Sequence, residues 1–110
     1  MLPKKNRLIK RVDFNRVYRY GNFIAEGPLS IKFAKNELKN ARIGFSIEKK
    51  FFKKATERNK IKRLLRKAFH LNLAEIKLGM DIVVFYKKSE GKPDFKIISE
   101  LVEKLIKKIK

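Results

Sequence analysis

Residues 53–70 carry a dense run of cations at helical spacing. On a helical wheel with about 100° per residue, one stripe holds Asn59, Lys62, Arg63 and Arg66. The opposite side of the wheel is apolar, and after Glu57 no acid follows until Glu75. An ordinary solvated helix mixes both signs of charge, because Glu–Lys pairs four residues apart stabilise it. Phosphates would offset the repulsion among these cations, and guanidinium groups can bind two phosphate oxygens at once. The stripe therefore predicts a nucleic-acid-binding surface.

Two other interpretations of this helix stay open. It could be an ordinary solvated amphipathic helix, or a basic helix that lies on an anionic membrane surface. The membrane interpretation is disfavoured because the apolar side of the helix is needed for packing against the rest of the chain. The further cations Arg58, Lys60 and Lys67 flank the stripe, so nearly all of the polar surface of the helix is positive.

The acids and the single histidine form no recognisable catalytic motif. His70 has no nucleophile partner in its segment, and no two acids stand in an acid–base or metal-binding pattern. We expect Asp13 and Asp94 to be helix N-caps and Asp81 to begin a strand. The absence of cysteine excludes a disulfide scaffold and any cysteine-based zinc site. The sequence therefore predicts a protein that is not a nuclease by itself.

The overall charge points to a polyanionic partner. The chain has 110 residues, of which 44% are hydrophobic, and 30 basic residues against 11 acids give a net charge of +19. This length suits a single domain over residues 1–110 with one modest core. The N-terminus lacks the apolar stretch of a secretory signal, and the apolar run 82–86 is too short to span a bilayer. We therefore expect a cytoplasmic protein without a membrane partner.

Hydrophobic periodicity predicts the order α-β-β-β-α-β-α. The predicted elements are a helix at 11–20, strands at 22–25, 29–34 and 41–48, a helix at 55–73, a strand at 80–86, and a helix from Asp94 nearly to residue 110. Gly21 is expected to end the first helix. Segments 26–28 and 89–93 are predicted to be a turn and a loop. One sheet with helices packed on it is the natural two-layer solution, and the long helix can connect two parallel strands.

The strands and the first helix also predict which side chains share a face. Strand alternation places Ser30 and Lys32, with Gly44 and Ser46, on a polar face of the sheet. Phe14 and Tyr18 lie one turn apart on one side of the first helix. Proteins commonly hold single-stranded RNA with aromatic rings that stack on the bases and with cationic side chains that contact the RNA backbone. Two such rings could equally be core residues.

The basic helix belongs to a longer pattern. It carries AxxRNxxKRxxR, formed by Ala55, Arg58, Asn59, Lys62, Arg63 and Arg66. It is preceded by Ile43-Gly44-Phe45-Ser46-Ile47 and Lys49-Lys50, and the N-terminal part holds Arg7-Leu8, Asp13-Phe14, Val17-Tyr18 and Gly21. Together these segments resemble the bacterial ribonuclease P protein family over essentially the whole chain. Three residues depart from its pattern: Glu48 replaces a small polar residue, Lys53 a glycine and Lys67 a common acid.

The resemblance implies an α+β fold, a two-layer α/β sandwich whose four-stranded mixed sheet has an unusual left-handed βαβ crossover. It also implies a division of labour in which an RNA subunit performs hydrolysis with Mg²⁺ and protein side chains do not. The residues expected to bind the catalytic RNA are Arg58, Asn59, Lys62, Arg63, Arg66, Lys49 and Lys50. A cleft for the 5′ leader of precursor tRNA is expected at Phe14, Tyr18, Ser30, Lys32 and Ser46. No obligate protein partner is evident.

Charge alone would also fit two other classes of protein, which the sequence leaves open. One is a ribosomal or other structural RNA-binding protein, and the other is a DNA-binding module with the basic helix as its reader.

Overall fold

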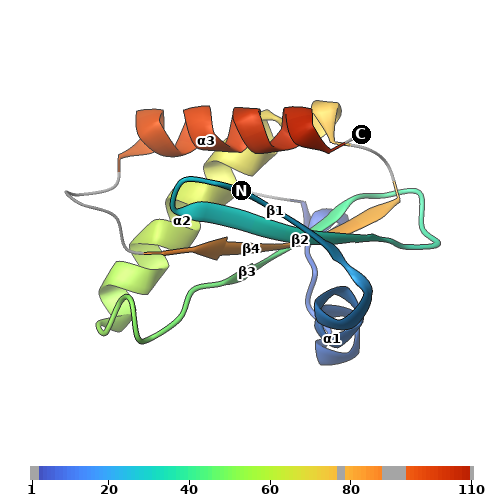
Figure 1. Ribbon diagram of the computed structural model, residues 1–110, viewed down its shortest axis with the longest axis horizontal. Coiled ribbons are helices and arrows are strands. Elements are labelled where there is room, and N and C mark those ends of the chain that lie inside the picture. The colour runs from blue at the N-terminus through green and yellow to red at the C-terminus, as the bar shows by residue number, and fades with distance from the viewer. Residues whose placement is uncertain (1–2, 77–78, 88–93, 110) are drawn as a thin grey trace.

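The computed structural model describes residues 3–76, 79–87 and 94–109. Its main elements, shown in Figure 1, are α1 (Arg11–Tyr20), β1 (Asn22–Glu26), β2 (Leu29–Lys35), β3 (Arg42–Ser46), α2 (Ala55–Leu71), β4 (Met80–Tyr86) and α3 (Phe95–Lys108). Two short 3-10 turns, Lys4–Asn6 and Leu73–Glu75, were not predicted. The order of helices and strands is the predicted one, and the α+β fold is confirmed.

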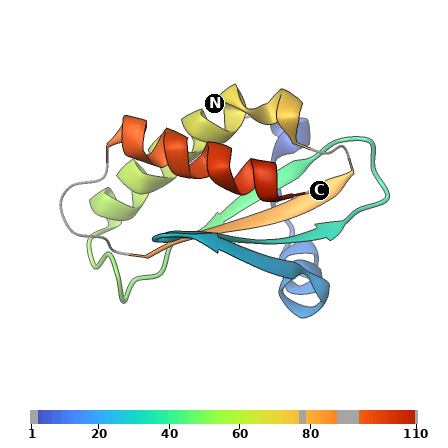
Figure 2. The same cartoon turned by 45° about the horizontal axis from the view of Figure 1, so that its top comes forward.

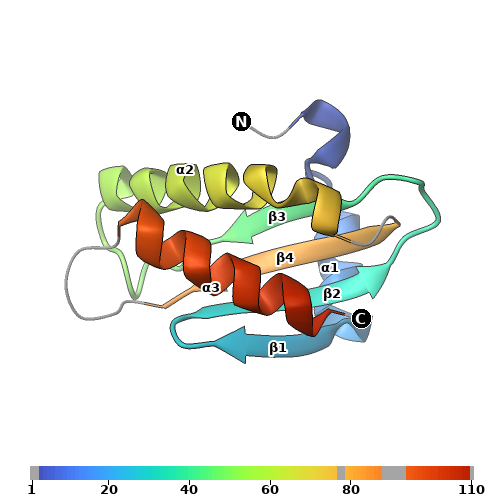
Figure 3. The same cartoon turned by 90° about the horizontal axis from the view of Figure 1, so that it is seen from above.

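The four strands form one mixed sheet in the order β1-β2-β4-β3. The pairs β1–β2 and β2–β4 are antiparallel, whereas β3 and β4 are parallel and are joined through α2. Figure 3 shows α2 in front of the sheet, with β3 pointing left and its parallel neighbour β4 below it; if the picture is turned so that these strands point upward, the chain passes from β3 leftward to β4. The crossover is therefore left-handed, as the resemblance implied and against the general right-handed preference.

The two faces of the sheet are covered unequally. Helices α2 and α3 lie together over one face, and α1 lies against the other (Figures 1 and 2). The main core fills the space under α2 and α3, with Leu29, Ile31, Ile43, Ile82 and Val84 from the strands. A smaller cluster of Leu8, Val17 and Val83 holds α1 on the opposite face. Because α1 is short, part of that face stays uncovered.

Strand alternation is confirmed in the two strands that carry the predicted polar face. Leu29 and Ile31 are buried in the main core, while Ser30 and Lys32 lie on the α1 side. In β3 the side chains of Ile43 and Phe45 pack with the main core, and Ser46 lies on the α1 side. The predicted polar residues of β2 and β3 therefore do lie on the sheet face beside α1, to which β4 adds the apolar Val83 and Phe85.

The N-cap prediction for Asp13 is wrong. Lys10 occupies the cap position of α1, no side chain caps the helix, and Asp13 lies in its first turn, with Oδ2 3.3 Å from Nη1 of Arg42. A tertiary ion pair therefore holds this carboxylate. The prediction for Asp94 is confirmed, because its side chain accepts a hydrogen bond of 2.9 Å from the backbone N–H of Ile97.

Other boundaries differ by a few residues. β3 is shorter than predicted at both ends, and α2 ends at Leu71 because Asn72 closes it, donating from Nδ2 to the carbonyl of Ala68 at 2.8 Å. Gly21 does end α1, but with an extended backbone, and a Cβ there would lie 2.4 Å from the carbonyl oxygen of Val17. The predicted loop 89–93 lies outside the described residues.

Candidate nucleic-acid interface

The predicted basic stripe lies on the outer side of α2. The helix buries Ile61, Leu65, Ala68 and Phe69 against the sheet and α3, so the polar side must face away from the core. Asn59 and Arg63 are exposed, and with Leu64, Arg66 and Lys67 they line a broad hollow along the helix. The helix thus presents cations over an open surface, which suits a polyanion of large radius better than a small ligand.

Arg58 differs from the other arginines of the stripe. Its Nη1 donates to the carbonyl oxygens of Phe52 and Lys53, at 2.8 and 3.0 Å. Part of its hydrogen-bonding capacity therefore holds the loop that leads into α2. Lys49 and Lys50, both exposed, lie in the same loop. Lys50 Nζ is 3.3 Å from a carboxylate oxygen of Glu48, the residue that departs from the family pattern.

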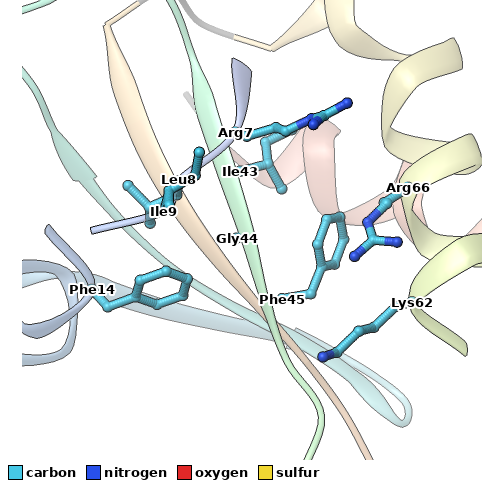
Figure 4. Close-up of a pocket in the computed structure, with 9 residues that line it drawn as sticks. All are labelled: Arg7, Leu8, Ile9, Phe14, Ile43, Gly44, Phe45, Lys62 and Arg66. Atoms are coloured by element: carbon cyan, nitrogen blue, oxygen red, sulfur yellow. The ribbon is translucent and has the colours of Figure 1, made fainter. Parts of the chain in front are cut away.

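Lys62 and Arg66 also reach the side of α2 that faces the sheet, so Arg66 lines both the outer hollow and a cavity beside the sheet, whereas Arg63 lines only the outer hollow. Lys62 and Arg66 line this cavity, of about 210 Å³, together with the N-terminal segment, β3 and Phe14 of α1 (Figure 4). The guanidinium carbon of Arg66 lies 5.8 Å from the ring centre of Phe45. Arg7 brings a third cation to this cavity from the segment that pairs beside Ile43. The cations of α2 and the aromatic side of α1 therefore meet at the edge formed by β3.

Gly44 makes this meeting possible. A Cβ at this position would lie 2.3 Å from Cζ of Phe14 and 3.1 Å from Cβ of Leu8. The missing side chain leaves room for the Phe14 ring to lie on β3. Phe14 is half-buried against the smaller cluster and also lines the cavity, so it has features of both the core and the cleft interpretations.

A second hollow, of about 340 Å³, lies over the polar sheet face. It brings together four of the five residues predicted for the leader cleft: Tyr18, Ser30, Lys32 and Ser46. The fifth, Phe14, touches Tyr18 with ring centres 6.2 Å apart, and Tyr18 in turn lies 6.0 Å from Phe85. A row of three rings therefore runs from the first cavity to the second.

Sequence reasoning missed four aromatic residues of the second hollow. Phe23, Phe51, Phe85 and the largely buried Tyr86 line it beside the predicted residues. The alternation of β4 could have found Phe85, since Val84 and Tyr86 on either side of it belong to the main core. Phe23 could have been found from the hairpin register, which pairs it with Lys32. Phe51 lies in a loop without periodicity, and no sequence signal placed it.

A buried ion network fixes α1 against the sheet beside these cavities. The carboxylate of Asp81, fully buried in β4, accepts from Arg42 Nε and Nη2 at 2.8 and 2.7 Å and from Asn36 Nδ2 at 2.7 Å. Arg16 of α1 also binds it. The hydrogen bond to Asp81 raises the pKa of Arg42 above its ordinary value. Asp81 does lie near the start of its strand as expected, but the sequence did not reveal that it joins three elements.

The described residues offer neither a metal site nor a membrane-spanning helix. No group of three histidine or acidic side chains among them is arranged to hold a metal ion. None of the helices found in those ranges has the length and apolar character needed to cross a membrane. His70 is exposed near the end of α2 and lines a hollow with Lys5 and Asn6.

Comparisons with known proteins identify the family of the chain. The family model Ribonuclease P matches residues 2–110. A ribonuclease P protein component of Clostridioides difficile is 38% identical over 102 residues, covering 92% of this chain and 89% of that protein. One from Caldanaerobacter subterraneus is 34% identical over 108 residues, covering 98% and 92%.

Solved structures give the same result. The RNase P protein of Thermotoga maritima superposes with a TM-score of 0.85 at 34% identity, covering 94% of this chain and 97% of that one. The Staphylococcus aureus protein gives 0.84 at 31% identity, covering 96% and 95%. Both the sequence match and the structural match extend over nearly the entire length. The chain belongs to the ribonuclease P protein family, whose members act with an RNA subunit in a ribonuclease complex.

Proposed function

We propose that the chain is the protein subunit that binds the catalytic RNA of ribonuclease P and the 5′ leader of precursor tRNA. The observation that carries this proposal is the meeting of two surfaces at β3. Cations from α2 and the Phe14 ring from α1 line one cavity there. A subunit that holds the leader beside the RNA that cuts it needs these two surfaces to be adjacent.

Helix α2 supplies the surface for the catalytic RNA. Asn59 and Arg63 face solvent, and Arg63 has Lys60, Arg66 and Lys67 as helical neighbours without an intervening acid. Phosphates would neutralise this cluster, and arginine is well suited to bind them through two parallel hydrogen bonds. Lys49 and Lys50 extend the positive surface into the preceding loop. Arg58 contributes by ordering that loop as well as by its charge.

The sheet face beside α1 supplies the surface for the leader. Tyr18 is 39% exposed, and Lys32 and Ser46 are half-buried in the same hollow. Exposed rings next to cations are typical of proteins that hold single-stranded RNA by base stacking and backbone contacts. Lys62 and Arg66 lie where the two surfaces join, so they can contact phosphates of the leader as well as those of the catalytic RNA.

Hydrolysis is assigned to the RNA subunit with its Mg²⁺. The buried carboxylate Asp81 is bound by two arginines, and the acid beside the cleft, Glu48, pairs with Lys50. Neither is placed to activate a water molecule on a bound RNA. The contribution of the chain is to bind and orient the two RNAs, and to screen the repulsion between their phosphates with its own cations.

Reconstitution tests the proposal. Precursor tRNA is incubated at low Mg²⁺ with the cognate catalytic RNA, with the protein, or with both. We expect faster cleavage at the mature 5′ end when both are present, and no cleavage by the protein alone. Robust metal-dependent cleavage by RNA-free protein, or no effect of the protein on the RNA-catalysed rate, would overturn the proposal.

A further inference from the structure

The sheet face beside α1, which is proposed to bind the leader, carries on β1 an exposed aromatic residue that has no role in the proposed function. Phe23 of β1 is 58% exposed, whereas the adjacent Ile24 packs against the main core on the other face of the sheet. It lines the same hollow as Tyr18 and Lys32. A single exposed apolar side chain is common on protein surfaces, so the neighbours of Phe23 must decide whether it has a role.

The neighbours of Phe23 are an aromatic ring and a cation, the two kinds of side chain that bind a nucleotide. Phe23 lies directly opposite Lys32 in the hairpin register, and Lys32 Nζ donates to the main-chain carbonyl of Tyr18 at 3.3 Å. The ammonium group is therefore held beside Tyr18, with Phe23 on the neighbouring strand. Two exposed rings that share a hollow with a positioned cation offer stacking surfaces and a phosphate partner together. The acid in this lining, Glu48, is paired with Lys50.

The order of the strands across the sheet indicates which leader nucleotides would lie near Phe23 and Tyr18. α2 lies along the β3 side of the sheet, and β1 forms the opposite edge (Figure 3). The cavity lined by Phe14, Lys62 and Arg66 is at β3 and next to α2, whereas Phe23 is on β1, with β4 and β2 between. If α2 binds the catalytic RNA, leader nucleotides near the cut lie by β3 and those farther upstream lie by β1.

We propose that Phe23 and Tyr18 form a distal leader subsite, in which they stack on one upstream nucleobase while Lys32 contacts its phosphate. The leader then crosses the sheet face from β3 toward β1. This inference rests on the proposed function, since it requires the leader to lie on this face. It adds a residue that determines how much of the leader contributes to binding.

The experiment measures the affinity of the reconstituted holoenzyme for precursor tRNAs whose leaders range from one to about ten nucleotides, a span typical of single-strand sites on small domains. For the wild type we expect affinity to rise with leader length to a plateau. Phe23→Ala should weaken binding by roughly tenfold, a typical loss for one stacked base, and only for leaders long enough to reach β1. Phe23→Trp should retain the wild-type plateau, and Phe23→Leu should behave like Phe23→Ala.

Ile97→Ala is the matched control, because Ile97 is an exposed apolar residue on α3, which covers the other face of the sheet. It should leave the whole series unchanged. A Phe23→Ala series identical to the wild type, with affinity still rising with leader length, would overturn the subsite and leave the proposed function intact. Equal losses for the shortest and the longest leaders would overturn the direction of the leader. A wild-type series with no dependence on leader length would overturn the proposed function itself.

Discussion

Gly44 shows how a single residue couples the two surfaces of the molecule. Adding a methyl group there would place it 2.3 Å from Phe14 Cζ, so the ring must leave its position on β3. We expect Gly44→Ala to destabilise the fold by about 1–3 kcal/mol, the usual range for overpacking. We also expect it to lower the affinity of the holoenzyme for precursor tRNA relative to mature tRNA. Urea denaturation and the ratio of the two affinities measure these effects.

The double variant Gly44→Ala, Phe14→Ala is the control for this prediction. If the clash with the ring causes the destabilisation, the two substitutions are not additive, because removing the ring makes room for the new methyl group. Additive losses of stability in the double-mutant cycle would show that Gly44 acts through something other than Phe14.

Asp81 links α1 to the sheet through its ion pair with Arg16. Replacing it by asparagine would leave Arg42 and Arg16 without the anion that they share in the buried site. Removing one partner of a buried ion pair typically costs about 3–5 kcal/mol. Both arginines are partly exposed and can regain water, so we expect Asp81→Asn to lie at the lower end of this range in urea denaturation.

The matched variant is Arg16→Gln, which removes the more exposed of the two arginines and leaves Arg42 paired with Asp81. It should be clearly milder than Asp81→Asn. If the two variants lose the same stability, the bond to Arg16 carries most of the energy of the network and the bonds to Arg42 and Asn36 carry little.

At the scale of elements, substituting two arginines of α2 should distinguish binding of the catalytic RNA from anchoring of the loop that precedes the helix. Arg63 is exposed, whereas Arg58 donates to two carbonyl oxygens of the preceding loop. Arg63→Ala should weaken binding of the catalytic RNA and lower the log–log salt slope by about 0.7–0.9 for one lost phosphate contact. Arg58→Ala should in addition lower the melting temperature, because the loop loses two hydrogen bonds.

Affinity measured against salt concentration, together with thermal melting, distinguishes the two residues. Equal melting temperatures for both variants would contradict the anchoring role of Arg58. An unchanged salt slope for Arg63→Ala would contradict the assignment of the stripe to the catalytic RNA.

Element order and side-chain faces could be predicted from the sequence because they follow from local periodicity. The alternation of Leu29 and Ile31 with Ser30 and Lys32 was sufficient to define both faces of β2. Features that depend on distant contacts could not be found in this way. Asp13 looked like a cap because its partner, Arg42, lies 29 residues away. The left-handed crossover came from the resemblance, since hydrophobic patterns contain no information about handedness.

The candidate site divides in the same way. The stripe on α2 could be predicted because a helix wheel determines which residues face together. That Lys62 and Arg66 line a cavity with Phe14, while Arg63 does not, depends on how α2 lies beside β3. The contribution of Phe23 depends on strand register, which brings it opposite Lys32. Neither arrangement is encoded in the spacing of one segment.

For the whole molecule, the charge is divided unequally between the two helices that cover the core. On α2 the exposed cations follow one another without an acid after Glu57, whereas α3 carries Glu100 and Glu103 among its lysines. With a net charge of +19, repulsion is concentrated where the RNA is proposed to bind. The free protein is therefore expected to lose stability at α2 in exchange for RNA affinity.

This exchange can be measured with one substitution on each helix. Arg63 has Lys60, Arg66 and Lys67 at the i−3, i+3 and i+4 positions, so Arg63→Gln removes three like-charge repulsions of about 0.2–0.5 kcal/mol each. Lys104 on α3 has Glu100 at i−4 and attracts Glu26, but it also has Lys107 and Lys108 at i+3 and i+4. Lys104→Gln therefore removes attractions and repulsions of similar size. At low salt we expect Arg63→Gln to melt above the wild type although it binds the catalytic RNA less tightly, and Lys104→Gln to melt close to the wild type. High salt should abolish the gain of Arg63→Gln, because the repulsion is screened over a Debye length of about 3 Å at 1 M. If Arg63→Gln melts below the wild type at low salt, the cations of α2 are stabilised within the free protein, and their concentration on one helix would not require an RNA partner.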